Sequence, residues 1–552
     1  MVYTSTYPPV TPQRQHTGGV FSFLFAPTSP NFREDKVALV DALTGTETTY
    51  GQLRSSSLRL ADGLTRVAGL KRGDTVLVFS PNSTLYPVLL FGSQAAGLIA
   101  STANAGYTPS ELAHQLEVSG ASVVLAAAEL LETTQKAVKE VGLGMDRVFV
   151  LPDAKGELPA KLPAGARSWK ELDGRDGFEP VAFTEKQAKE DIAYLPFSSG
   201  TTGKGKGVAL SSFNCTSCML QTASTKDLFD RGDTVLSCLP MSHIFGLIVM
   251  LHLHLYNGGK LIILPKFDLV QALEAIQRYK CTTALIVPPV ALALAKHPLV
   301  DKYDLSSLRF ILSGAAPLSA GLQQALAARL KPVKVVQGLG MSETTSVSIL
   351  PDISNVVKPG SVGKLLSTTV ARLVDPDGRD VKEGESGELW LRGPNNMLGY
   401  HRNEQATRET ITEDGWLKTG DICERDDEGH YFVVDRSKDL IKYKGFQVAP
   451  AEVEGVLLTS PLVADAAVIG IWSDEHATEL PRAYIVPNAE HARSSSLAAD
   501  VAKFIEEQLA PHKRLRGGVV VVEAIPKSPS GKILKKDLRV LAAKEGKTKA
   551  KL

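Results

Sequence analysis

Short runs of Val, Ile and Leu, separated by stretches of helical length, are the feature that most constrains how this chain can fold. They include TVLVFS, ASVVLAA and RFIL, and they lie at residues 75–80, 121–127, 147–151, 234–239, 261–264, 284–287 and 309–312. Amphipathic segments near residues 50–68 and 82–97 alternate with the first of these runs. Because strands that are apolar on both faces are typical of parallel sheets covered by helices, we predict an α/β fold. In such sheets, ligands bind in the loops at the strand ends.

The sequence pattern changes from about residue 360, where short runs of alternating apolar and polar residues such as GELWLRGP indicate a small antiparallel subdomain. A boundary follows near residues 435–438, and the segments beyond it predict a compact domain of about 110 residues. A chain of 552 residues is too long for one hydrophobic core. The predicted parts are an N-terminal domain at 1–436 with two parallel-sheet α/β subdomains and a β subdomain at about 360–436, a smaller α+β domain at 437–543, and a basic tail at 544–552. The Pro/Thr-rich first 20 residues are expected to be loose.

Composition and charge exclude several classes of protein. The formal net charge of +1 gives no basis for binding nucleic acid or a polybasic membrane surface. No segment reaches the ~18 apolar residues of a membrane span, and the first residues lack the regions of a signal peptide. Five cysteines suit a reducing compartment, and the pair Cys215 and Cys218 reads as buried thiols rather than as a redox or metal site.

The last three residues, Ala550, Lys551 and Leu552, are similar to the S-K-L peroxisomal signal, with alanine in place of serine. They predict a peroxisomal protein that an import receptor recognises. A solvated lysine tail on a cytoplasmic protein is the alternative.

A glycine-rich loop, SSGTTGKGKGV at residues 198–208, directly follows the apolar run IAYLPF. Glycines let backbone N–H groups approach phosphate oxygens, and Lys206 supplies a mobile positive charge, so the loop predicts a phosphate cradle. Gly207 stands where a Walker loop has its magnesium-binding hydroxyl, which argues against a P-loop NTPase. A flexible loop without a ligand remains the alternative.

Other polar stretches also contain candidate chemical groups. His243 in PMSHIFG follows an apolar run, and we interpret it as a cleft residue rather than a metal ligand. Glu343 in QGLGMSETT could accept a divalent cation, although a helix N-cap is an equal alternative. Asp421 in GWLKTGD and Arg436 could bind a ribose, and Lys532 lies on a Pro/Ser/Gly loop. On its own, Lys532 would be interpreted as a surface lysine.

Together, these motifs resemble the adenylate-forming acyl-CoA synthetases, and within them the coumarate:CoA ligases and their peroxisomal relatives. SSGTTGxxKGV, QGxGMSE, GWLKTGD, DRSKDLIKYKGFQVAPAEVE and PKSPSGKIL occur in that order, and the resemblance covers about residues 21–541. It implies a ligase that uses ATP, Mg²⁺ and coenzyme A to activate a small carboxylic acid as acyl-AMP. It also implies a mobile C-terminal domain and a monomer or homodimer.

The resemblance implies a role for each matching residue. The ATP/AMP site would comprise Ser198, Ser199, Gly200, Thr201, Thr202, Gly203, Lys206, Ala315, Gln337, Gly338, Leu339, Gly340, Ser342, Asp421, Arg436, Lys438 and Gln447, with Lys438 also at the hinge. Catalysis would involve Lys532, His243 and Lys442, the metal Thr202 and Glu343, and coenzyme A Lys266, Lys444 and Gly445. The acyl pocket would be lined by Phe245, Val249, Val287, Leu312 and Leu350.

The chain departs from the family pattern at three positions. Gly205 replaces a proline and makes the phosphate loop freer, and Leu339 replaces an aromatic residue that stacks on adenine. Leu312 stands where coumarate ligases commonly have lysine, so we expect an aliphatic or unsubstituted aryl acid rather than a hydroxylated phenylpropanoid. A coumarate-type ligase, an enzyme that passes the acyl group to a carrier protein or another acceptor, and a non-catalytic nucleotide sensor are the alternatives.

Overall fold

The computed structural model describes residues 1–549, except 11–18, 155, 199–203, 226–231, 354–356, 445, 474–475, 477 and 529–530, and it describes only the backbone of 545–549. Residues 550–552 lie outside this description, and so does the predicted peroxisomal signal. No helix in the described part of the chain is long and apolar enough to cross a membrane.

The first sheet is formed by the early apolar runs. Its strand order is β10-β11-β9-β5-β4-β6-β7-β8, and β5, β4, β6, β7 and β8 run parallel to one another. The strands are β4 (Thr75–Phe79), β5 (Ile99–Ala103), β6 (Ala121–Ala127), β7 (Val148–Leu151), β8 (Arg167–Ser168), β9 (Ile192–Tyr194), β10 (Phe197–Ser198) and β11 (Lys206–Ser211). The helices between and beside them include α2 (Tyr50–Arg66), α3 (Leu85–Ala95), α4 (Pro109–Ser119), α5 (Leu131–Glu140) and α7 (Ser212–Ala223). All five residues of β4 are buried, as expected for a strand covered on both faces.

The second sheet carries the loops that follow β15 and β16. Its order is β16-β15-β14-β12-β13-β2-β3, with all neighbours parallel except β2 and β3. The strands are β2 (Val37–Asp41), β3 (Glu47–Thr49), β12 (Thr234–Ser237), β13 (Lys260–Ile263), β14 (Thr283–Ile286), β15 (Phe310–Ser313) and β16 (Lys334–Gln337), and the helices include α9 (Leu269–Tyr279), α10 (Pro288–Lys296) and α11 (Ala320–Arg329). Ser313 pairs with Gln337 at the carboxyl ends of β15 and β16, so the two loops leave the sheet side by side.

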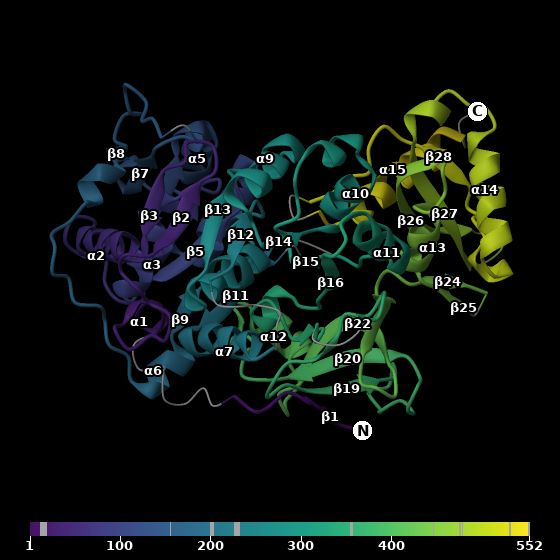
Figure 1. Cartoon of the computed structure of the whole chain (residues 1–552), viewed down its shortest axis with the longest axis horizontal. Coiled ribbons are helices and arrows are strands. Elements are labelled where there is room, and N and C mark those ends of the chain that lie inside the picture. Colours follow the sequence, from purple (N-terminus) through teal and green to yellow (C-terminus); the bar gives the residue numbers. More distant parts are fainter. Residues whose placement is uncertain are drawn as a thin grey trace.

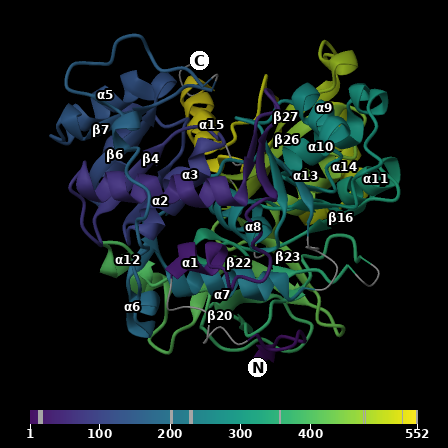
Figure 2. The same ribbon diagram turned by 60° about the vertical axis from the view of Figure 1, so that its left-hand side comes forward.

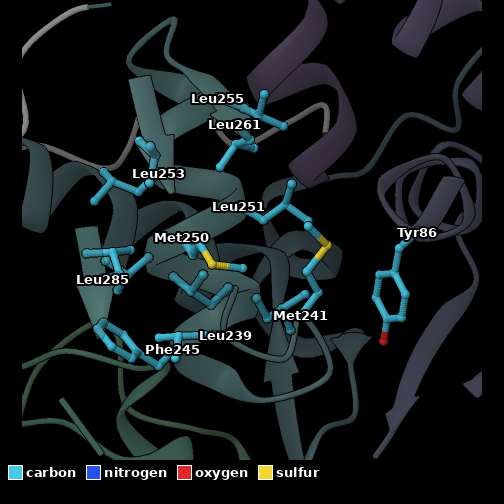
Figure 3. Close-up of a cluster of buried hydrophobic side chains, with 14 of the residues drawn as sticks. Tyr86, Leu239, Met241, Phe245, Met250, Leu251, Leu253, Leu255, Leu261 and Leu285 are labelled. Atoms are coloured by element: carbon cyan, nitrogen blue, oxygen red, sulfur yellow. The ribbon is translucent and has the colours of Figure 1, made fainter. Parts of the chain in front are cut away.

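A buried π-helix, Phe245–Leu253, packs between these sheets and belongs to the large hydrophobic core. Figure 3 shows its residues Phe245, Met250 and Leu251 in one cluster with Met241 and Leu285. Wide helical turns of this kind are rare and often lie at functional sites. Here the π-helix presents its first residue, Phe245, to a cavity.

The third sheet is antiparallel, with the order β1-β19-β20-β22-β23. Its strands are β1 (Tyr3–Thr4), β19 (Val370–Val374), β20 (Gly387–Arg392), β22 (Leu417–Arg425) and β23 (Tyr431–Arg436), and both views place it next to the N-terminus (Figures 1 and 2). The expectation that the first 20 residues are loose is therefore wrong at β1. Tyr3 pairs with Ala371 and is buried, because the edge of β19 offers its backbone groups a partner.

The C-terminal part has its own small core. It contains β24 (Ile441–Tyr443), β25 (Phe446–Val448), β26 (Val463–Ser473), β27 (Thr478–Pro487) and β28 (Val519–Val521), with α13 (Pro450–Leu457), α14 (Leu497–Gln508) and α15 (Lys535–Lys549). In Figure 1 this part, coloured from green to yellow, lies beside α10 and α11. The predicted fold class, parallel α/β with a β subdomain and a smaller α+β C-terminal part, is confirmed.

Candidate active site

Two cavities meet where the C-terminal part faces the second sheet. The smaller has a volume of about 360 Å³ and the larger about 970 Å³. Both are lined by Ala315, Gly338, Leu339, Gly340, Arg436, Asp439 and Lys532. The larger one is lined by residues of α11 and α13, two helices whose positions Figure 1 shows. The residues that lie far apart in the sequence thus share one continuous site.

Asp421 and Arg436 form an ion pair at the junction of the two parts. They are register partners on β22 and β23, and Arg436 Nε lies 2.9 Å from Asp421 Oδ1. The charge of Asp421 raises the pKa of the Arg436 guanidinium despite its burial. Asp421 is only 3% exposed and lines the larger cavity. Its carboxylate can accept hydrogen bonds from a vicinal diol, as the ribose prediction requires.

Lys532 belongs to the C-terminal part, but it lines both cavities beside Arg436 of β23. Its loop is tightened by a hydrogen bond from its backbone N–H to Ser528 Oγ, and Gly531 has a φ of +79°. A Cβ on Gly531 would lie 3.1 Å from Val287 Cγ2, so the loop packs directly against the start of α10. Burial, together with the positive charge of Arg436, lowers the pKa of Lys532 to about 8. The ammonium is therefore poised beside the site, close to losing its charge.

His243 lines the smaller cavity, as predicted. Burial, together with the positive charge of Lys532, lowers the pKa of its imidazole to about 4. The ring is neutral at pH 7, so it offers one hydrogen-bond donor and one acceptor rather than a charge. His252 and His254, further along the chain, are buried in the core and hydrogen-bonded to the carbonyl groups of Leu247 and Val249.

The described ends of the glycine loop also reach the smaller cavity. Ser198 and Lys206 pair across β10 and β11, and both line it. The Lys206 Nζ lies 4.2 Å from the centre of the Tyr400 ring. Ser199, Gly200, Thr201, Thr202 and Gly203 lie outside the described residues, so their role as a phosphate cradle stays a prediction.

Glu343 has the properties of a ligand for a hard cation. It is 6% exposed, lines the smaller cavity, and accepts a 2.7 Å hydrogen bond from the Tyr400 hydroxyl at Oε1. No described residue donates a hydrogen bond to its Oε2. Mg²⁺ binds one or two carboxylates and completes its shell with water and phosphate oxygens, and a carboxylate open on one side fits that pattern. The second predicted metal residue, Thr202, is not described.

The loops after β15 and β16 require small residues and unusual backbone angles. Ala315 has a φ of +68°, a Cβ on Gly338 would lie 2.6 Å from Leu350 Cδ2, and a Cβ on Gly340 would overlap the Ser346 carbonyl oxygen. The Gln337 amide exchanges two hydrogen bonds with the backbone of Leu318, so its side chain fixes the neighbouring loop. Larger side chains would therefore displace the loops beside which the adenylate is predicted to lie.

The predicted acyl-pocket residues are only partly brought together. Phe245, Leu312 and Leu350 line the smaller cavity with Met341 and Val347, two apolar residues that the sequence analysis did not place there. Val249 lies in the buried π-helix and Val287 touches the Lys532 loop, and neither is among the described residues that line the two cavities.

The remaining predicted residues divide into two groups. Ser342 and Lys438 line the smaller cavity, and Gln337 and Gln447 the larger one. Lys266, Lys442 and Lys444 are exposed and do not appear among the described lining residues of either cavity. Gly445 lies outside the description. Their roles in catalysis and in binding coenzyme A stay predictions.

Two further residues, Tyr400 and His114, contact the site and were missed by the sequence analysis. Tyr400 lies on β21 (Gly399–Tyr400), which pairs with β11, and His114 Nε2 lies 2.8 Å from the carbonyl oxygen of Gly205. The only sequence signal is the Gly–Tyr pair of LGYHR, since no local pattern shows that it pairs with a strand about 190 residues earlier.

The C-x-x-C pair consists of buried thiols, as predicted. Cys215 and Cys218 are buried on α7, and burial raises the pKa of both thiols, to about 11 for Cys218. Thiols with raised pKa values carry little thiolate at neutral pH and react slowly.

Comparisons with known proteins cover almost the whole chain. Residues 27–401 match the family model "AMP-binding enzyme", and residues 452–532 match "AMP-binding enzyme C-terminal domain". The chain is 39% identical to a probable 4-coumarate–CoA ligase 1 of Dictyostelium discoideum, over 92% of each chain. It is 37% identical to the peroxisomal OPC-8:0-CoA ligase 1 of Arabidopsis thaliana, over 93% of this chain and 92% of the relative. Among solved structures, an anthranilate CoA ligase in complex with anthranoyl-AMP is similar with a TM-score of 0.86 and 27% identity, covering 97% of this chain and 99% of the other.

Proposed function

Because the chain belongs to the AMP-binding enzyme family, we propose that it is an ATP-dependent carboxylic acid:CoA ligase. It would form an acyl-adenylate and pyrophosphate, and then transfer the acyl group to coenzyme A with release of AMP. The observation that carries the proposal is the approach of Lys532 from the C-terminal part to the Asp421–Arg436 pair. Relatives that are named CoA ligases match nearly the whole chain, and they support coenzyme A as the acyl acceptor.

In the first step, a carboxylate oxygen bonds to the α-phosphorus of ATP while the bond to the bridging oxygen of pyrophosphate breaks. Negative charge spreads over the phosphoryl oxygens, so cations placed in advance lower the barrier. Lys532 would supply one such cation and Lys206 another. Glu343 would hold Mg²⁺, which neutralises the triphosphate when bound. Neutral His243 would donate a hydrogen bond to the reacting carboxylate without forming a competing ion pair.

In the second step, the thiol of coenzyme A loses its proton to solvent, its sulfur bonds to the acyl carbon, and the bond to the AMP oxygen breaks, which releases AMP. Lys532 lines both cavities and would lie beside the bound nucleotide, so we infer that the C-terminal part rotates about Lys438 before the thiol enters. Lys438 is exposed beside the smaller cavity. Exposed Lys444 and Lys266 are available to contact coenzyme A after that rotation, and exposed Lys442 is available for its proposed role in catalysis.

For the acid we propose an apolar substrate, aliphatic or unsubstituted aryl. Phe245, Leu312, Val347 and Leu350 give the smaller cavity an apolar wall, against which a phenolic hydroxyl would lose its hydrogen bonds to water. The second candidate is a coumarate-type substrate, which the relatives named 4-coumarate–CoA ligase favour.

A panel of acids tests both the activity and the substrate. We expect AMP release that depends on both acid and coenzyme A, with octanoate and phenylacetate preferred over coumarate by kcat/KM. Pyrophosphate exchange with acid but no coenzyme A isolates the first step. Exchange without any CoA-dependent AMP release would indicate another acceptor, and the absence of both would leave a nucleotide sensor.

We also propose a peroxisomal location, supported by the name of one relative and by the resemblance of Ala550, Lys551 and Leu552 to the S-K-L signal. A fluorescent protein fused to the N-terminus should enter peroxisomes, and deleting the tripeptide should leave it in the cytosol.

A further inference from the structure

Lys206 is held on two sides by residues that no motif identified. The first is Tyr400, whose ring lies 4.2 Å from the Lys206 Nζ. An ammonium over an aromatic face is attracted by the ring, most strongly where water is excluded, and Tyr400 is only 7% exposed. The pairing of Val208 with Tyr400 brings Tyr400 close to Lys206, because Lys206 and Val208 belong to the same strand, β11.

The Tyr400 hydroxyl adds a second link, because it donates to Glu343 Oε1 at 2.7 Å. One side chain therefore touches both the cation and the carboxylate that face the smaller cavity. Burial and the Glu343 charge raise the pKa of Tyr400, so its hydroxyl keeps the proton that it donates.

His114 restrains the other side of Lys206 through the backbone. Its Nε2 lies 2.8 Å from the Gly205 carbonyl oxygen, and because a carbonyl only accepts, this nitrogen must carry a proton. The carbonyl of Gly205 and the backbone N–H of Lys206 belong to the same peptide group. Gly205 lacks a side chain that would limit its backbone, so this hydrogen bond supplies a restraint that glycine itself does not.

We propose that Tyr400 and His114 are positioning residues that hold Lys206 and Glu343 ready for the β- and γ-phosphates of ATP with its Mg²⁺. The inference rests on the proposed function, because it assigns these phosphates to this end of the cavity. Neither residue takes part in bond making. Their effect is to order a long lysine and a carboxylate before the nucleotide arrives, so that binding does not have to order them.

Binding of two nucleotides to the full-length protein tests the inference. The probes are the non-cleavable analogue α,β-methylene-ATP with Mg²⁺, and AMP, which lacks the distal phosphates, both measured by calorimetry. Tyr400→Phe should weaken binding of the analogue by about tenfold, the effect of losing one hydrogen bond to a charged group, and should raise the Mg²⁺ concentration needed for half-maximal binding. AMP affinity should stay within about twofold of the original protein.

The His114 arm uses a rescue. His114→Ala should weaken binding of the analogue severalfold, while His114→Gln should restore it, because an amide N–H can reach the same carbonyl. The matched control is Tyr279→Phe, which removes a hydroxyl that donates to the Ala42 carbonyl elsewhere in the molecule. It should change neither affinity.

The outcomes separate the inference from the proposed function. Unchanged binding of the analogue in Tyr400→Phe and His114→Ala would overturn the inference alone. Equal losses for the analogue and AMP, with a lower melting temperature, would show a structural role and also overturn it. A parent protein that binds AMP but not the analogue with Mg²⁺ would overturn the proposed function and the inference together.

Discussion

The charge of Lys532 should give acyl-adenylate formation a basic limb near pH 8. Burial lowers the pKa of this lysine to about 8, and the neighbouring Arg436 contributes in the same direction. A cation with a depressed pKa loses its charge as the pH rises through that value. From a pKa of about 8, the charged fraction is roughly nine-tenths at pH 7 and one-tenth at pH 9.

The rate should follow this fraction. kcat/KM for ATP in the pyrophosphate-exchange reaction reports the free protein, so it should be level below pH 8 and fall about tenfold per pH unit above it. The limb in kcat should lie at higher pH, because the charge of bound triphosphate stabilises the ammonium. Lys532→Arg keeps its charge throughout this range, so it should remove the limb even where it lowers the rate.

Two results would refute this reasoning. A kcat/KM profile that stays level to pH 10 would mean that Lys532 is not desolvated beside the nucleotide. A limb of unchanged position in Lys532→Arg would assign the titration to another group. A Lys139→Arg variant on the exposed surface of α5 serves as the matched control and should leave the profile unchanged.

Three other substitutions test separate parts of the site. Lys532→Ala should slow adenylate formation by roughly 10²–10³-fold, because the developing charge loses one preorganised group. It should spare thioester formation from supplied acyl-adenylate. Equal losses in both half-reactions would contradict the proposed rotation. Gly340→Ala should lower the free energy of unfolding by about 3 kcal/mol and abolish nucleotide binding, because the new Cβ overlaps the Ser346 carbonyl oxygen. Thermal and denaturant unfolding measure the loss of stability. An unperturbed variant would mean that the loop yields easily. Leu312→Lys should raise kcat/KM for coumarate relative to octanoate by at least about tenfold, and an unchanged ratio would place the acyl chain elsewhere.

The sequence predicted those parts of the molecule that local patterns determine. Buried parallel strands such as β4 and β6 appear as apolar runs, and Asp421, Glu343 and Lys532 stand in short motifs of glycine and polar residues. Each signal lies within about ten residues, so it needs no knowledge of the tertiary structure.

Contacts between distant segments were beyond that reasoning. The pairing of Tyr3 with Ala371 depends on an open strand edge that only the folded sheet creates. Tyr400 reaches Glu343 and Lys206 because β21 pairs with β11, and nothing near Tyr400 in the sequence shows that pairing. Family resemblance carried over the residues of known motifs and therefore passed over this one.

The contact between Gly531 and Val287 ties these observations to the order of the two chemical steps. A loop that packs its glycine on the start of α10 brings Lys532 to Arg436 and Asp421, where it lines both cavities. This position of Lys532 suits the proposed adenylate-forming step, and Lys266 and Lys444, which we propose to bind coenzyme A, do not line either cavity. Residues that serve the second step need not face the nucleotide during the first. The proposed rotation at Lys438 would bring another face of the C-terminal part to the same cavity for the second step, while Asp421 and Arg436 remain paired across β22 and β23.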